Sequence, residues 1–312
     1  MENRLVVTAA PHITGADTTQ KIMGRVCIAL LPTLIASIVI FGWKSLILTA
    51  VCVVACVGFE YLWCLIRGKE STASDLSAAV TGILLAFNLP ATLPWWMAVV
   101  GAFVAIIVVK QLFGGIGYNI ANPAIVARIA LSGGFAAKMT ALVPVQSGVD
   151  AFSGATPLAA QAGSAAYRTL LLGTYSGVLG ETCALTLIAG GIYLIATKVI
   201  SPVIPVTYLG TAAVLSLCFG RDPIYEILSG GLLLGAIFMA TDYVTSPTTR
   251  MGKLIFGVGL GLITCLIRFL GTPSEGVSFA ILLMNLLVPY IEVGTRQAKL
   301  GIAKEKKGGD AK

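Results

Sequence analysis

The chain has 312 residues, of which 57% are hydrophobic and only 11% are charged, and its mean hydropathy is +0.91. Soluble domains carry roughly 25% charged residues, so this composition excludes an ordinary soluble protein and indicates a chain surrounded by lipid. The net charge of +7 is accounted for by membrane topology, as described below, and we expect no nucleic-acid partner.

The first residues are mixed and polar, without the apolar run and small-residue cleavage site of a secretory signal. We therefore expect no removable leader. The chain has one histidine, His12, and seven cysteines, none of them in a Cys-x-x-Cys pair. This set predicts no zinc, haem or iron–sulfur site, and we expect the cysteines to be small packing residues. Redox chemistry would then need an organic cofactor or a metal on a partner.

Ten apolar stretches approach the length of about 20 residues that a membrane-spanning helix needs. They are residues 25–42, 45–66, 76–90, 94–113, 117–134, 180–199, 202–219, 223–240, 252–270 and 276–293. The third and the eighth are short or interrupted: each follows an aspartate, contains glycine and ends in polar turn residues. If the ten stretches are divided into two runs of five, each of these two is the third segment of its run.

This repetition predicts an all-α polytopic membrane protein with about ten transmembrane segments, arranged as two inverted five-helix repeats. An odd number of spans inverts the second copy, and broken segments at matching places indicate a binding site near the membrane midplane. The chain is expected to begin with a cytoplasmic N-terminal segment (1–24), followed by the first repeat (25–134) and an extracytoplasmic connection (135–179). The second repeat (180–293) and a basic cytoplasmic tail (294–312) would follow.

The distribution of lysine and arginine predicts the orientation of the chain. With both termini in the cytoplasm, fifteen of the 21 basic residues lie on the inner side and six lie on the outer side or near it. This bias follows the positive-inside rule, and it places the 135–179 connection on the outer face.

Several polar residues interrupt the apolar segments. Asn119 and Asn122 are three residues apart and would share a helix face in the fifth segment, beside Pro123. Polar groups in a membrane usually face a cavity, a cofactor or one another, so these amides either contact a ligand or join helices. Arg128 either extends to the outer interface or meets an anionic group near the outer face.

Two carboxylates are further candidates. Asp242 follows the eighth segment in "FMATDYVTSPTTR", where Thr245, Ser246 and Thr248 supply hydroxyl groups. This composition suits either a polar ligand or a capped loop. Glu60, near the end of the second segment, is either a proton or ion ligand or an interfacial charge.

The gap between the two runs contains "DAFSGATP" at 150–157. Thr156 can act as the N-cap of a helix that begins at Pro157. The free N–H groups and the dipole at such a helix start favour an anion. The motif therefore suits both a helix cap and a phosphate attached to the threonine hydroxyl.

This stretch resembles the covalent-flavin site of the RnfD and NqrB family, whose pattern is Asp-x-x-Ser-Gly-Ala-Thr. Four more stretches are similar to the same family, in the same order: "LLAFNLP" at 84–90, "GGIGYNIANPA" at 114–124, "FMATDYVTSPTT" at 238–249 and "EGVSFAILLMNLLVP" at 275–289. The resemblance covers nearly the whole chain, and the short N-terminal segment is more similar to RnfD than to NqrB. It implies a urea-transporter-like fold, which agrees with two inverted repeats.

The resemblance implies that a flavin transferase joins FMN to Thr156 through a phosphoester. Asp150 would be recognised by the transferase, and Ser153, Gly154 and Ala155 would complete the attachment motif. It also implies a second, noncovalent flavin, riboflavin, in the helical bundle. The other candidate cofactor-binding residues are Asn119, Asn122, Arg128, Asp242, Thr245, Ser246 and Thr248.

Members of this family belong to a complex that moves electrons between ferredoxin and NAD⁺, coupled to Na⁺ or H⁺ transport. The resemblance therefore implies a bacterial or archaeal cytoplasmic (inner) membrane, a second covalent-flavin subunit, iron–sulfur subunits, an NAD-binding subunit and small membrane subunits. We expect no catalytic residue and no metal site in this chain, which would not turn over substrate alone. Glu60 and Asp242 are candidates for an ion path.

Two other functions remain compatible with the fold, because a fold does not determine function. The first is a transporter or channel for a small neutral solute, which would have no need of the Asp-x-x-Ser-Gly-Ala-Thr motif. The second is a structural anchor, against which Asn119, Arg128 and Asp242 argue, since polar groups in a membrane are costly without a role.

Overall fold

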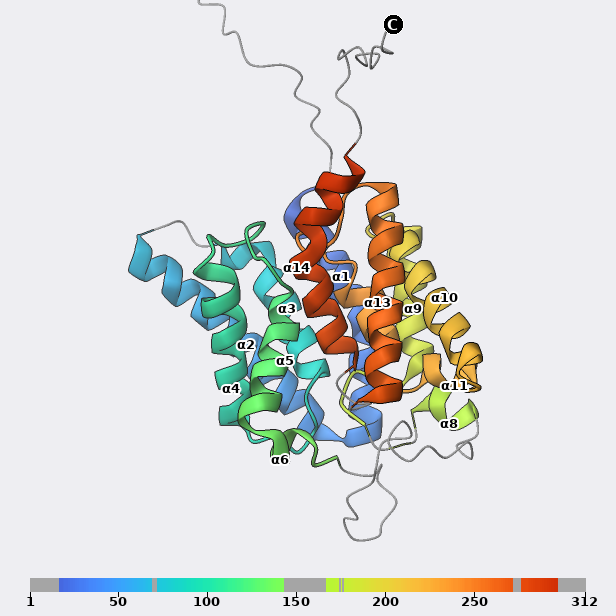
Figure 1. Cartoon of the computed structure of the whole chain (residues 1–312). Helices are drawn as coiled ribbons and strands as arrows, with labels where there is room; N and C mark the ends of the chain where they lie inside the picture. Colours follow the sequence, from blue (N-terminus) through green and yellow to red (C-terminus); the bar gives the residue numbers. More distant parts are fainter. Residues whose placement is uncertain are drawn as a thin grey trace, which may run out of the picture.

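The computed structural model describes residues 17–68, 72–142, 167–173, 175, 177–271 and 276–296, and every regular element in these ranges is helical (Figure 1). The first half contains α1 (Thr19–Phe41), α2 (Trp43–Arg67), η1 (Ala73–Asp75), α3 (Ser77–Phe87), α4 (Trp95–Phe103), the π-helix η2 (Val104–Gln111), α5 (Pro123–Gly134) and α6 (Ala136–Met139). The second half contains α8 (Tyr167–Leu172), α9 (Ala184–Ala196), α10 (Val203–Cys218), α11 (Pro223–Leu228), α12 (Leu232–Leu234), the π-helix η3 (Gly235–Met239), α13 (Arg250–Leu270) and α14 (Gly276–Thr295).

Four of these helices, α1, α2, α13 and α14, are long and apolar enough to cross a membrane. Shorter apolar helices are α3, α5, α9, α10 and the continuous stretch Trp95–Gln111. The outward surface of the bundle exposes large aliphatic and aromatic side chains such as Val39, Leu65 and Tyr290, as lipid contact requires. The chain is a multi-pass all-α membrane protein, and the arrangement as ten inverted spans stays a prediction.

The fifth predicted segment begins later than expected. The prediction that Asn119 and Asn122 share a helix face is wrong, because α5 starts at Pro123 and Asn122 is its N-cap. The Asn122 Oδ1 atom accepts hydrogen bonds from the N–H groups of Ala124 (3.0 Å) and Ile125 (3.4 Å). Proline suits the first helical position, since its fixed φ is helical and its missing N–H would be unpaired there.

The third and eighth segments are short or broken, as predicted. The third, α3, has 11 residues, and the eighth is divided into α11, α12 and η3 around Gly230, whose φ is +67°. The sixth segment, expected from residue 180, begins as a helix at Ala184. The predicted 135–179 connection also contains two short helices, α6 and α8.

The ends of the two interrupted segments meet inside the molecule. The Asn88 Nδ2 atom, at the end of α3, lies 3.7 Å from the Met239 Sδ atom at the end of η3. The Asn122 Nδ2 atom donates to the Met239 carbonyl at 3.2 Å. Residues that are 151 and 117 positions apart in the sequence thus form one polar contact between the halves.

The two short helices that flank the Thr156 motif lie at one end of the bundle. The hydroxyl groups of Thr249 and Thr295 are 2.7 Å apart, so the start of α13 lies beside the end of α14. Figure 1 shows α6 and α8 at the end of the molecule opposite to the end of α14.

Close packing of α3 on α2 depends on Gly82. A Cβ atom at this position would lie 2.7 Å from the Val53 Cα atom and 3.0 Å from the Cys52 carbonyl oxygen. We expect Gly82→Ala to lower the free energy of unfolding by about 1–3 kcal/mol, because the backbone of α2 would have to move. Thermal unfolding of the detergent-purified protein measures this effect.

The matched control is Gly58→Ala in α2, where an added Cβ would meet nothing within 4 Å. This change is expected to raise the free energy of unfolding by at most about 1 kcal/mol, because alanine favours the helix more than glycine does. Equal melting temperatures for the two variants would contradict the packing account.

Candidate functional site

A cavity of about 360 Å³ lies among α1, α3, the segment that leads to α5 and the turn after η3. Its walls are largely apolar, and Ile22, Val26, Leu84 and Phe238 are among the residues that form them. The polar side chains that line it are Thr19, Ser77, Thr81, Lys110, Asn119, Asn122, Thr241, Asp242 and Tyr243. An apolar pocket of a few hundred Å³ with a few polar groups is typical of a small-molecule or cofactor site.

Both predicted asparagines line this cavity and are held by hydrogen bonds. The buried Asn119 donates from Nδ2 to the Ala121 carbonyl at 3.2 Å. Asn122 is fixed by its cap on α5 and by Met239. In the amide orientation that satisfies both its atoms, Asn285 accepts from the Asn122 N–H (3.1 Å) and donates to the Thr245 carbonyl (3.0 Å). Asn122 therefore joins the two halves while it borders the cavity.

The turn after η3 contributes one carboxylate to the cavity. Asp242 lines it and accepts a hydrogen bond from the buried Thr245 hydroxyl at 3.1 Å. Burial raises the pKa of Asp242, while hydrogen bonds from Thr245 and the backbone act in the opposite direction. Thr248 is exposed and donates to the Glu292 carboxylate at 2.9 Å. Thr245, Ser246 and Thr248 are not among the residues that line the cavity.

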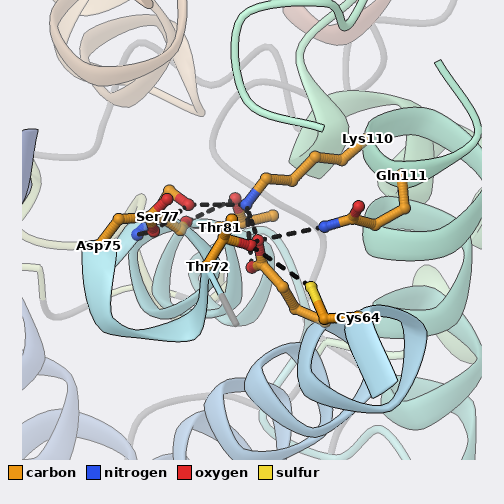
Figure 2. A network of polar contacts seen from close by, with 8 residues as sticks. Cys64, Thr72, Asp75, Ser77, Thr81, Lys110 and Gln111 are labelled. Carbon is orange, nitrogen blue, oxygen red and sulfur yellow. Dashed lines mark hydrogen bonds and ion pairs between the residues drawn. The ribbon is translucent and has the colours of Figure 1, made fainter. Parts of the chain in front are cut away.

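A buried ion pair borders the cavity at Lys110. The Lys110 Nζ atom lies 2.9 Å from both Glu60 carboxylate oxygens and 2.6 Å from the Ser77 Oγ atom. Glu60 also accepts hydrogen bonds from Thr72 (2.7 Å) and Gln111 (3.1 Å). Figure 2 shows Lys110 and Gln111 reaching from one helix toward Thr72 and Ser77. Glu60 is fully buried within the protein.

Lys110 is one of the fifteen basic residues that the positive-inside rule assigns to the inner side. In the structure its side chain is only 4% exposed and is paired with Glu60. A usable signal was present in the sequence, because a lysine and a glutamate inside apolar helices need partners.

A second buried ion pair joins α5 to the turn before α9. The Arg128 Nη1 atom lies 3.1 Å from a Glu181 carboxylate oxygen and 2.8 Å from the Asn88 Oδ1 atom. The anionic group that Arg128 meets is therefore a side chain of this protein. Arg128 is not among the cavity-lining residues. Sequence reasoning missed Glu181, whose signal was a carboxylate within an apolar stretch.

A third cluster lies in the second half, where Arg268 of α13 reaches α11. Its Nη1 atom donates to the Glu226 carbonyl at 2.7 Å and lies 3.4 Å from the Glu226 carboxylate. Arg221 approaches the same carboxylate at 3.2 Å. This cluster stabilises the interrupted eighth segment and lies apart from the residues that line the cavity.

The attachment motif itself, Asp150 and Ser153 to Thr156, lies outside the described residues. Within the described ranges, no group of three histidine, cysteine, aspartate or glutamate side chains could hold a metal ion. The cavity offers amide and hydroxyl groups at a few points between apolar walls. This donor set fits a flat heteroaromatic ring with a polar edge, such as the isoalloxazine ring of a flavin.

These features define a polytopic membrane protein with an internal cavity that carries a few polar side chains. Its sequence identifies it further: the chain belongs to the NQR2, RnfD, RnfE family, which matches residues 6–301. The resemblance to the RnfD and NqrB family is thereby confirmed.

Three relatives are similar over almost their whole length, and each is named as the D subunit of its complex. The chain is 44% identical to the D subunit of the Na⁺-translocating ferredoxin:NAD⁺ oxidoreductase complex of Acetobacterium woodii, over 98% of both chains. It is 38% identical to that of the proton-translocating complex of Clostridium ljungdahlii, over 96% of this chain and 97% of the relative. It is 33% identical to that of the ion-translocating oxidoreductase complex of Escherichia coli O7:K1, over 95% and 98%.

Proposed function

We propose that this chain is the RnfD subunit of an ion-translocating ferredoxin:NAD⁺ oxidoreductase complex of the Rnf type and that it relays electrons through bound flavin. The observation that carries the proposal is the similarity to relatives named as the D subunit of such complexes, over nearly the full length of both chains. The partners would be a second covalent-flavin subunit, iron–sulfur and NAD-binding subunits and small membrane subunits. The complex would lie in the cytoplasmic membrane.

The first flavin is FMN, joined by a phosphoester to Thr156. The motif that supports this assignment contains Asp150, Ser153, Gly154 and Ala155, and a flavin transferase would recognise it. Bound flavin supplies reversible electron transfer, while the protein sets its position and electrostatic surroundings.

The second flavin is noncovalent and occupies the cavity. Asn119, Asn122 and Asp242 would hold its polar edge, and the apolar walls around Leu84 and Phe238 would exclude water from its faces. The buried contacts of Asn122 with both halves support a preformed site, because the amide cannot turn away without losing its cap on α5. A rigid amide of this kind keeps a fixed orientation toward the ligand.

The proposed membrane arrangement is two inverted five-helix repeats, at 25–134 and 180–293, with both termini in the cytoplasm. The contact between Asn88 and Met239 supports it, since the third segments of both repeats end there. The position of α6 and α8 opposite to the end of α14 supports an extracytoplasmic Thr156 (Figure 1).

Electron transfer would be coupled to movement of Na⁺ or H⁺. The relatives include one complex named for Na⁺ and one named for protons, so we propose either ion. Glu60 and Asp242 are the candidate ion-path carboxylates, supported by the burial of Glu60 and by the position of Asp242 on the cavity wall.

The test uses the protein purified from its native host, because a host without the flavin transferase would not attach FMN. We expect the wild-type chain to fluoresce in a denaturing gel and Thr156→Ala to lose this signal completely. Thr140→Ala is the matched control, since this exposed threonine ends α6 and lies outside the motif. Flavin released on denaturation reports the noncovalent site and is expected from all three proteins.

An unmodified wild-type chain would contradict the covalent assignment. Thr156 would then be a helix cap, and solute uptake into vesicles that contain the purified protein would test the transporter alternative, for which a cavity of this size is also large enough.

A further inference from the structure

Lys110 places a positive charge on the wall of the cavity. Among the described residues that line the cavity, the charged side chains are those of Lys110 and Asp242. Lys110 belongs to the π-helix η2, a rare type of helix that is often found at functional sites. A cation inside an apolar bundle is costly and usually has a functional role.

The carboxylate that pairs with Lys110 does not line the cavity. The Lys110 Nζ atom lies 2.9 Å from both carboxylate oxygens of Glu60, and Glu60 is fully buried and absent from the cavity wall. Gln111, the next residue of η2, and Thr72 also donate to the Glu60 carboxylate, which fixes its position. The positive member of this ion pair therefore borders the cavity, and the negative member does not.

An electron that enters the cavity changes the charge of the group that holds it. A flavin in the cavity would receive one electron from another carrier of the complex; no bond would form or break, and the ring would gain one negative charge. A charge in an apolar interior is costly unless an opposite charge lies near it. Lys110 supplies such a charge, and Glu60, which does not reach the cavity wall, weakens its effect without cancelling it.

We propose that the Lys110–Glu60 ion pair sets the reduction potential of the cofactor in the cavity, with Lys110 stabilising the added electron and Glu60 limiting that stabilisation. The inference deepens the proposed function and rests on its noncovalent flavin. Charges near the ring are one of the means by which a protein tunes a bound cofactor. Both side chains act through their electric field and undergo no reaction themselves, so neither is a catalytic residue.

The test measures the midpoint potential for the first electron of the noncovalent flavin, by spectroelectrochemical titration of the full chain in detergent at one fixed pH. Every protein compared carries Thr156→Ala, so that no flavin attached there contributes to the signal. Glu60→Gln keeps the size of the side chain and removes its charge. We expect this change to favour the reduced flavin by at least about tenfold, which is a rise of about 59 mV for one electron.

The double variant Glu60→Gln with Lys110→Gln removes both charges and is expected to disfavour the reduced flavin by about threefold or more, because the nearer, positive charge is lost. It also serves if Glu60→Gln does not fold, since it leaves neither member of the pair buried without its partner. Shifts of opposite sign in the two variants would not arise from a merely structural role. Glu226→Gln, which breaks a buried pair with Arg268 outside the cavity, is the matched control and is expected to leave the potential unchanged.

Potentials that stay unchanged, or that shift in the same direction in both variants, would overturn the inference. Unchanged potentials are the result expected if a proton enters the cavity together with the electron, because the ring then gains no net charge. If only the double variant folds, an unchanged or raised potential in that variant overturns the inference. Protein that holds no noncovalent flavin, and binds none when riboflavin is added, would instead overturn the proposed cavity site and the inference with it.

Discussion

Replacing Glu181 with alanine is expected to lower the free energy of unfolding by about 3–5 kcal/mol, because the buried Arg128 would lose its carboxylate partner. Both side chains are less than 10% exposed and their charged atoms are 3.1 Å apart. Desolvation of an ion is costly, and only the partner charge and hydrogen bonds offset that cost. Thermal or denaturant unfolding of the detergent-purified protein measures the loss.

Two further variants show whether the loss comes from an uncompensated charge. The double variant Glu181→Leu with Arg128→Met removes both charges and is expected to recover most of the stability, since a buried pair can be replaced by apolar residues at little cost. Asp17→Ala breaks the exposed pair with Arg25, where the side chains are 56% and 33% exposed, and should cost no more than about 1 kcal/mol. A Glu181→Ala variant as stable as Asp17→Ala would contradict this account.

The residues next to Glu181 also connect the two halves of the chain. Just before Glu181, the N–H groups of Leu179 and Gly180 donate to the carbonyls of Leu89 (3.2 Å) and Phe87 (2.9 Å). These bonds satisfy carbonyls at the end of α3, which is one of the tasks of a helix C-terminus. The chain that follows the Thr156 motif is therefore bonded to the same short helix that lines the cavity at its other end.

The sequence predicted the all-helical membrane class and the two interrupted segments for physical reasons that hold in the structure. Hydrophobic length marks a spanning segment, and glycine with polar turn residues marks an interruption. Gly230 illustrates the second rule, since its positive φ divides the eighth segment. The apolar pattern predicted a helix from residue 117, whereas α5 starts at Pro123 because the Asn122–Pro123 pair is a helix-start signal.

The buried ion pairs were beyond a single sequence. Glu60 and Lys110 are 50 positions apart, and Arg128 and Glu181 are 53 positions apart, so no local spacing connects them. Their common signal was a charge inside an apolar segment, which calls for a partner without identifying it. Of the candidate cofactor residues, Asn119, Asn122 and Asp242 line one cavity. Their role toward a flavin stays a prediction, as does that of the motif around Thr156.

The second large effect concerns electron transfer itself. Thr156→Ala is expected to reduce ferredoxin-dependent reduction of NAD⁺ by native membranes to the background rate. If electrons pass through FMN on Thr156, its loss leaves a gap in a series of carriers that the remaining centres cannot bridge. The effect is therefore larger than that of any change which only shifts the properties of a bound flavin, such as a substitution at Asn119 or Asp242.

The most direct measurement of the central claim is the rate of NAD⁺ reduction by reduced ferredoxin in membranes of the native host, compared for wild type, Thr156→Ala and the control Thr140→Ala. The account predicts equal rates for wild type and Thr140→Ala and a background rate for Thr156→Ala, with all three chains present in equal amounts in the membrane. A wild-type rate in the Thr156→Ala membranes would show that electrons do not pass through this residue and would contradict the account.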